Sequence, residues 1–351
     1  MKSKLLTALI LGCALTGVGN STANAQTDKF VLGGYMDWTY TVYEAGLMPS
    51  TFDAFHFNPI FIYQMEDNLM ASSEIEFEHA GDEINVEYAQ IDYLWNDYVT
   101  FTVGKFLVPF GAFNRRLHPS WVSRVPGKPY SNNHVVPTDW SEIGIMASGA
   151  VGFGENGGRV NYAFYVGNGL EGAAGDDLRD LRHEKDPREK NNDNKAVGGR
   201  LGVVPAAGIE FGISGYTDKY DAVADPVLNL NMIGADAEFH HEDYFELRGE
   251  YNQVDQELTP GQYAVKRGYY AQASLKLNVT DEDILMPVEL ALRFSGQNFP
   301  GEMNDVYEVT PTINYYFGST SVLRLGFRMN GEKTGYKTPN NEFTALFAKG
   351  F

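Results

Sequence analysis

Apolar and polar residues alternate along many short segments of this chain. Five segments show one apolar and one polar face most plainly: 68–79, 244–252, 269–279, 288–297 and 322–329. In 68–79, for example, Glu74, Glu76 and Glu78 share one face, and Ile75 and Phe77 lie on the other. Side chains of a β-strand point alternately to opposite faces, so these segments are predicted to be two-faced strands.

The connections between the predicted strands alternate between long and short. The long or moderate connections fall near 43–53, 108–141, 168–196, 218–230, 255–266, 298–304 and 331–341. The short turns between them fall near 66–67, 96–97, 154–158, 205–208, 241–243 and 318–320. Two connections depart from this alternation. Connection 81–83 is short where a long one is expected, and 280–287 is long where a turn is expected. A soluble sandwich shows the same two faces but has no reason to sort its connections in this way. The sequence therefore predicts an all-β fold: a transmembrane antiparallel β-barrel of about 16 strands.

The first 25 residues have the features of a cleaved secretory signal peptide. Lys2 and Lys4 precede an apolar stretch, and Ala23-Asn24-Ala25 forms an A-x-A cleavage site. A lipoprotein signal at Cys13 is the alternative. We expect the rest, 26–351, to be one barrel domain in the bacterial outer membrane. It would contain no cysteine, which excludes disulfides and thiol chemistry there.

The composition and the end of the chain agree with this prediction. The sequence contains 22 Phe, 21 Tyr and 4 Trp, as expected for aromatic girdles at the membrane interfaces. Phe343, Ala345, Phe347 and Phe351 share one face of the last strand, which Lys349 interrupts. Bacterial outer-membrane barrels resemble this pattern, and the resemblance implies that the barrel assembly machinery reads Phe351. An ordinary edge strand is the alternative.

The connection 108–141 contains the most distinctive chemistry. Residues 98–138 contain no Asp or Glu, although the chain has 46 acidic residues and a net charge of −19. The cations and histidine that we predict at a pore constriction are Lys105, Arg115, Arg116, His118, Arg124 and Lys128. A loop of this length is usually functional, and we expect it to fold into the barrel as the third long loop. Clustered positive charge in a narrow throat favours anions. The alternative is a loop over the rim whose basic groups pair with lipopolysaccharide phosphates.

The start of this loop also resembles a known family. Gly104-Lys105-Phe106-Leu107-Val108-Pro109-Phe110-Gly111 is similar to the G-(R/K)-F-x-x-P-F region of phosphate-selective porins of the O and P type. The resemblance implies a sixteen-stranded, usually trimeric, outer-membrane channel with an inward third loop and a basic path for anions. Lys105 stands at the basic position of the motif. The many carboxylates on the polar faces depart from a basic anion path.

Further charges fall on the polar faces of the predicted strands. We expect the pore wall to carry a basic set and an acidic pair: Arg248, Lys276, Arg293, Arg324, Arg328, Glu74 and Glu76. Opposite charges on neighbouring strands would pair, and a solvated polar lumen without selectivity is the alternative. The lipid-facing side cannot easily carry these groups, since an Arg or Lys at the bilayer midplane costs about 2–4 kcal/mol.

Several short motifs resemble enzyme or metal sites, but the structure predicted around them does not fit those sites. Gly152 to Gly157 satisfies GxGxxG, but a predicted strand follows it where a dinucleotide site needs a helix. His240 and His241 are adjacent on a strand and point opposite ways, which disfavours joint metal binding. No G-x-S-x-G sequence is present. We therefore expect no enzyme activity, cofactor, metal site or nucleic-acid partner.

The sequence taken together predicts an outer-membrane channel for passive diffusion of small hydrophilic solutes or ions, with a preference for anions such as phosphate. The expected partners are outer-membrane lipids, lipopolysaccharide, the assembly machinery and two further copies of the chain. The main alternative is a barrel plugged by its loops that serves as a structural or adhesive surface protein.

Overall fold

A computed structural model describes residues 29–46, 48–117, 119–137, 139–154, 157–179, 181, 194–220, 227–278, 282–299, 305–332 and 338–351. The predicted signal peptide and His118 lie outside the described residues. Across the described ranges, none of the helices has the length and apolar character needed to cross a membrane.

Sixteen β-strands make up most of the described chain. They are β1 (Phe30–Tyr43), β2 (Thr51–Glu66), β3 (Leu69–Glu78), β4 (Glu83–Leu94), β5 (Thr100–Leu107), β6 (Ser141–Phe153), β7 (Gly158–Gly167), β8 (Ala196–Ala206), β9 (Ile209–Lys219), β10 (Asn229–His241), β11 (Phe245–Thr259), β12 (Gln262–Lys276), β13 (Val288–Asn298), β14 (Val306–Gly318), β15 (Ser321–Glu332) and β16 (Glu342–Gly350). The short helical pieces are η2 (Glu44–Gly46), η3 (His79–Gly81), α2 (Phe113–Arg116) and η4 (Tyr130–Asn132).

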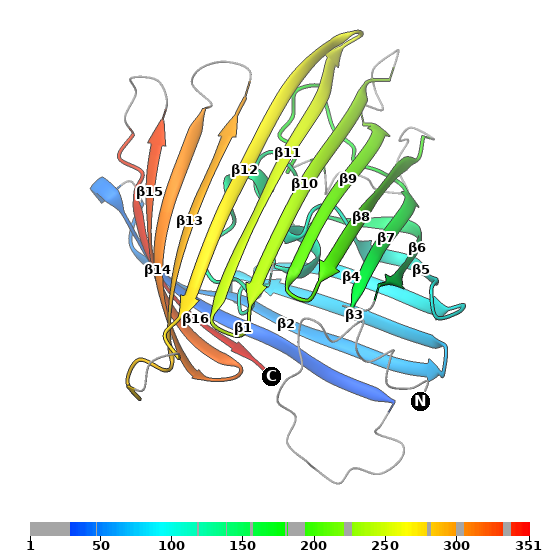
Figure 1. The fold of residues 1–351 in the computed structure, drawn as a ribbon. Helices are drawn as coiled ribbons and strands as arrows, with labels where there is room; N and C mark the ends of the chain where they lie inside the picture. The colour runs from blue at the N-terminus through cyan, green and yellow to red at the C-terminus, as the bar shows by residue number, and fades with distance from the viewer. Residues whose placement is uncertain are drawn as a thin grey trace.

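The strands form one closed barrel in which each strand is antiparallel to its sequence neighbours (Figure 1). Pairing of β1 with β16, in the register Tyr40 with Ala345, closes the ring. At the C-terminus, Phe351 exchanges two main-chain hydrogen bonds with Gly34, at 2.9 and 3.1 Å. The predicted sixteen-stranded antiparallel barrel is confirmed.

The two ends of the barrel carry different connections, as predicted. We call them the loop end, where 108–140 and 168–195 begin, and the turn end, where 67–68, 207–208 and 319–320 reverse the chain. The prediction for one connection was wrong. The moderate connection near 255–266 is a tight turn, because β11 continues to Thr259 and β12 begins at Gln262.

The barrel is apolar outside and polar inside. On β13, Leu290, Leu292 and Phe294 face outward with 42–50% of their surface exposed, whereas Arg293 faces inward and is fully buried. The same alternation is present in all five segments that the sequence pattern singled out. An exposed apolar surface around a closed ring, with every strand paired on both sides, is what hydrocarbon requires of a β-protein.

The long connection between β5 and β6 folds into the barrel, as the sequence predicted. Phe110, Val135 and Trp140 of this connection are at most 1% exposed. They belong to one apolar cluster with wall residues that include Tyr216 and Met232. The rings of Trp140 and Tyr216 meet edge to face at 4.8 Å. We call residues 108–140 the inward loop.

Candidate functional site

The base of the inward loop is built by the motif that resembled a porin family. Gly104 has φ +124°, and a Cβ there would lie 2.4 Å from the main-chain oxygen of Ala89, so only glycine fits. Phe106, in β5, and Phe110, at the start of the loop, are both buried in one apolar cluster. Asn114 then joins the two ends of the loop, donating to Val108 O and Trp140 O at 2.9 Å each. The motif residues therefore hold the loop in place.

Glu250 on β11 fixes the first turn of the inward loop. Its carboxylate accepts hydrogen bonds from the main-chain N–H groups of Ala112 and Phe113, at 3.1 and 3.2 Å. It also accepts from the side-chain amide of Asn132, at 2.7 Å, so one wall residue ties both halves of the loop. Gly111, at φ +64°, is required here, since a Cβ would lie 2.4 Å from a Glu250 oxygen.

Two arginines of the inward loop reach almost to the turn end. Arg116 pairs with Glu210 at 3.0 Å and with Glu238 at 3.5 Å. Glu210 is the second residue of β9, which begins at the turn end. Burial alone would lower the pKa of Arg116, but Glu238 and Glu210 raise it overall, so the guanidinium stays charged.

Arg124 lies equally deep. It donates to the Tyr316 hydroxyl at 2.8 Å and lies 3.5 Å from Glu289, the second residue of β13. Burial would lower the pKa of Arg124, but Tyr316, Glu289 and Glu246 raise it overall. The loop therefore crosses the lumen from the loop end to the turn end instead of capping the rim.

Two wall arginines bind the main chain of the inward loop. Arg293 donates to Gly127 O at 2.8 Å and Pro126 O at 3.3 Å, and pairs with Glu308 at 3.0 Å. Arg324 donates to Ser120 O at 2.6 Å and Trp121 O at 3.0 Å. Both arginines are 0% exposed. These members of the expected basic wall hold the loop by satisfying its carbonyl groups.

The remaining contacts of the loop run along β13 and β15. The main-chain N–H of Tyr130 donates to Ser295 Oγ at 3.1 Å, and the Tyr130 hydroxyl donates to Asn330 at 2.9 Å. Burial raises the pKa of Tyr130 to about 12, so this hydroxyl keeps its proton. Lys128 pairs within the loop with Asp139. The loop is thus bonded to the wall from β9 to β15.

The wall formed by β1 to β4 carries mostly acidic groups. Glu74 and Glu76 face inward from β3, and both accept from the Asn58 amide, at 2.9 and 3.2 Å. Glu87 of β4 is also buried. The lumen is therefore divided: paired arginines lie on the loop side, and carboxylates predominate on the opposite side. His56, Glu76 and Glu78 lie close enough together to hold a metal ion.

Most predicted site residues face the lumen, and one does not. Arg248, Lys276, Arg293, Arg324, Arg328, Glu74 and Glu76 all lie on inward positions of their strands. Arg115 is exposed on α2, and Arg116, Arg124 and Lys128 lie within the inward loop. The placement of Lys105 in the constriction was wrong. It pairs in register with Ala89 and Ile143 on the outer face of the barrel, and its ammonium donates to Val86 O.

The expected pairing of opposite charges between neighbouring strands is present. Arg328 of β15 bridges Glu308 of β14 at 2.8 Å and Glu342 of β16 at 3.0 Å, whereas Arg248 pairs with Glu246 on its own strand, β11. Lys276 lies 5.6 Å from the ring centre of Tyr316. Sequence reasoning missed the wall partners of the loop, such as Glu289 and Tyr316. The alternation along their strands predicts that both side chains face inward, but nothing in the local sequence connects them with Arg124.

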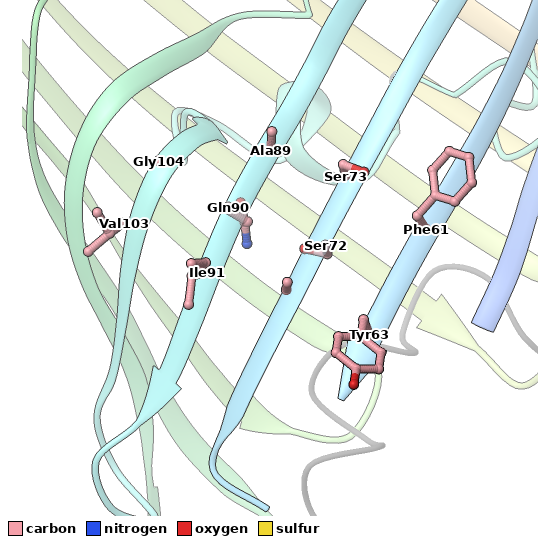
Figure 2. Close-up of a pocket in the computed structure, with 10 residues that line it drawn as sticks. Phe61, Tyr63, Ser72, Ser73, Ala89, Gln90, Ile91, Val103 and Gly104 are labelled. Carbon is pink, nitrogen blue, oxygen red and sulfur yellow. The ribbon is translucent and has the colours of Figure 1, made fainter. Parts of the chain in front are cut away.

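The outer face also has a shallow groove across β2 to β5, of about 520 Å³. Figure 2 shows that Phe61 and Tyr63 on β2 stand on one side of it, and Ile91 and Val103 on the other. Small residues line the floor between them: Ala71, Ser73, Ala89 and Gly104.

The sequence matches no protein-family model. An uncharacterized protein of Aquifex aeolicus (strain VF5) is 29% identical over 199 residues. The match covers 53% of this chain and 44% of that protein, so the chain spans less than half the length of this relative.

Solved structures match most of the barrel. The anion-selective porin of Comamonas acidovorans has a TM-score of 0.64 at 11% identity and covers 92% of this chain and 99% of its own. The outer-membrane channel DcaP of Acinetobacter baumannii has a TM-score of 0.63 at 11% identity, covering 92% and 97%. OmpF of Salmonella typhi, in complex with daunomycin, has a TM-score of 0.62 at 10% identity, covering 92% and 97%. The narrower resemblance to phosphate-selective porins stays a prediction. The chain has the sixteen-stranded barrel fold of outer-membrane porins.

Proposed function

We propose that this protein is a channel for passive diffusion of small hydrophilic solutes and ions across a bacterial outer membrane. The observation that carries the proposal is the inward loop, which is hydrogen-bonded along the lumen of a barrel with an apolar exterior. Barrels of this size leave a water-filled lumen, and a loop bound inside sets the width of the passage. The protein would do no chemistry on the solute.

The constriction would lie between the inward loop and the wall from β1 to β4. We assign the loop side to Arg115, Arg116, Arg124 and Lys128, and the opposite side to Glu74 and Glu76. Arg116, Arg124 and Lys128 are each paired with a carboxylate, so the field that they present to a solute is reduced. This pairing supports a preference for cations, whereas the basic residues between 98 and 138 predict a preference for anions.

Recording of single channels in a planar lipid bilayer tests this proposal. Under a KCl gradient, the purified full-length protein should conduct and should show a reversal potential of the sign expected for K⁺ permeation. A reversal potential of the opposite sign would return the preference to anions such as phosphate. Absence of any conductance from correctly folded protein would remove the channel.

A plugged barrel with a structural or adhesive role is the second candidate. It is favoured by the buried ion pairs that fill one side of the lumen, including Arg293 with Glu308, both at most 1% exposed. The conductance measurement separates the two candidates, because a barrel filled by its loop carries no current.

The proposed location implies particular partners. Outer-membrane lipids would cover the apolar exterior, lipopolysaccharide would meet the loop end, and the assembly machinery would read the last strand together with Phe351, which follows it. We further propose a homotrimer in which the groove across β2 to β5 lies against a second copy. Its floor of small residues allows close approach of another barrel, which bulky lipid-facing residues would prevent.

A further inference from the structure

One histidine of the lumen wall is surrounded by carboxylates from two neighbouring strands. His56 lies on β2, Asp37 on β1, and Glu76 and Glu78 on β3. His56 Nδ1 is 2.8 Å from Asp37 Oδ2. The other ring nitrogen, Nε2, is 3.3 Å from Glu78 Oε1 and 3.7 Å from Glu76 Oε1. A single nitrogen thus faces two carboxylate oxygens.

We propose that His56, Glu76 and Glu78 form a binding site for a divalent first-row transition-metal ion such as Zn²⁺. One ligand atom from each residue lies within 4.8 Å of the other two. Ligand atoms about 2.0–2.2 Å from a zinc ion lie roughly 3.3–3.6 Å apart in a tetrahedral site. The distances from Nε2 to the two carboxylates therefore fit a shared ion. An imidazole nitrogen among the ligands favours zinc, iron or nickel over magnesium or calcium.

The contact with Asp37 orients the histidine for this role. Asp37 is 0% exposed and also accepts from the main-chain N–H of His56, at 3.1 Å, so both of its oxygens bind one residue. An ionised carboxylate can only accept, which places the proton of a neutral imidazole on Nδ1 and leaves the lone pair of Nε2 directed at Glu76 and Glu78. A lone pair facing carboxylates is repelled by them, and either a metal ion bound to Nε2 or a proton on Nε2 relieves that repulsion. Carboxylate–histidine–metal arrangements of this kind are common in proteins.

The surroundings contain a second, independent sign that a cation binds here. Glu87 is 6% exposed and its carboxyl faces that of Glu76. Its Oε2 atom is buried and, among the described residues, accepts no hydrogen bond. Asn58, which donates to Glu76, likewise has a buried Oδ1 without a hydrogen-bond partner among these residues. A buried carboxylate oxygen without a donor is costly unless a cation is close.

The charges around the site are mainly negative. Asp37 pairs with His56, and the carboxyl groups that interact with one another here are Glu74, Glu76, Glu78, Glu87 and Asp139. The cations nearby are Lys128, which pairs with Asp139, and Arg324, which interacts with Asp37 at longer range. A divalent ion would balance part of this surplus. Glu78 ends β3 at the loop end and its side chain is 17% exposed, so an ion can enter from that mouth.

Two other histidines among the described residues lack the arrangement found at His56. His240 has one ring nitrogen facing Glu238 and the other facing Glu246, so no single atom is shared between two carboxylates. His79 Nδ1 is 2.7 Å from Asp53 but forms no such cluster among the described residues. His79 lies next to Glu78 at the end of β3 and therefore provides a matched control.

The proposal is tested by measuring metal bound to the purified full-length protein in detergent. The protein is stripped with a chelator and dialysed against ZnCl₂, and bound zinc is measured by elemental analysis. We expect one zinc per chain in the wild type and in His79→Gln, and none in His56→Gln. Asp37→Asn should weaken binding about 10–100-fold, as for other residues that orient a metal-binding histidine. Co²⁺ should give visible absorption bands that His56→Gln lacks.

Folding is checked by the heat-dependent shift in gel mobility that barrel proteins show. If His56→Gln does not fold, Glu78→Gln takes its place, because this side chain is partly exposed and its loss should still weaken binding. The proposal is overturned if the wild type retains no zinc after dialysis, or if His56→Gln binds as much as the wild type. Equal binding of Mg²⁺ and Zn²⁺ without dependence on His56 also overturns it and leaves a protonated imidazole as the explanation of the cluster.

Discussion

Individual side chains decide where the inward loop lies. Glu250 accepts four hydrogen bonds, three of them from the loop (Ala112, Phe113 and Asn132) and one from Asn252. Arg293 and Arg324 supply the complementary donors to the loop carbonyls. Hydrogen bonds to charged groups contribute about 1.5–3 kcal/mol each, more than neutral ones. The loop is therefore held by a few charged anchors.

Replacement of Glu250 by Ala should loosen the inward loop. Loss of even one charge-assisted hydrogen bond makes a detached state roughly tenfold more populated. We expect single channels of Glu250→Ala to show frequent conductance fluctuations that the wild type lacks. Glu257→Ala is the control, because the carboxylate of Glu257, on the same strand, accepts hydrogen bonds from Asn229 and Gly261 and, among the described residues, from none in the inward loop. Equal noise in both variants would contradict the anchoring role.

Removal of the two deep arginines should increase cation preference. The variant Arg116→Ala with Arg124→Ala leaves Glu210, Glu238 and Glu289 without these partners, so the throat becomes more negative. The measurement is the reversal potential under a KCl gradient. Arg267→Ala removes the same kind of charge from the outer face and should leave the potential unchanged. An unchanged potential in the double variant would mean that ions do not pass beside these residues.

At the scale of elements, the two faces of each strand have opposite requirements. Outward positions meet hydrocarbon, where a charge is expensive, while inward positions meet water, the loop or other polar side chains. The pleat makes this alternation strict, and a slip of one residue would exchange the faces along a whole strand. Local departures, such as the register shift between Asp37 and Thr39 on β1, leave the closed ring intact.

An arginine on the outer face of β13 should destabilise the barrel far more than one in the lumen. Leu292 lies near the middle of β13 and is 50% exposed on the outer face. We expect Leu292→Arg to lower the free energy of unfolding by about 2–4 kcal/mol in lipid vesicles. Asn161→Arg, on the inward face of β7, should cost much less. Urea titration with tryptophan fluorescence measures both, and equal losses would argue against a lipid-facing exterior.

For the whole molecule, the groove across β2 to β5 is a hollow in the outer surface with a floor of small residues. A second copy seated there would cover Ala71, Ser73 and Ala89, which offer little apolar area to lipid. The same interface would place β1 to β4, with their acidic lumen face, next to the axis of an assembly.

Filling this groove should break the proposed trimer. Ala89→Trp introduces a ring where a neighbouring barrel would pack, and we expect monomers in detergent by light scattering. Ala271→Trp, outward on β12 and away from the groove, should leave the oligomer intact. A monomeric wild type would refute the trimer without affecting the barrel.

Much of the architecture follows from the sequence alone. Strand faces such as Leu292 against Arg293 were readable, because the side-chain period of a strand is fixed at two residues and lipid rejects charge. The inward course of 108–140 was also predicted, from the length of the loop and from the absence of Asp and Glu between 98 and 138. The order of long and short connections identified the closed barrel.

The tertiary structure alone decided what the charges do. Arg293 and Arg324 were expected to line a pore, but they bind loop carbonyls that lie more than 160 residues away in the sequence. Lys105 was misplaced because the family motif carries a basic residue without stating which face of β5 it occupies. Asp37, His56 and Glu78 are brought together only by the pairing of three strands. The position of a residue along a strand determines which face of the barrel it occupies. Its partners depend on the register between strands and on the path of the inward loop, and long-range packing determines both.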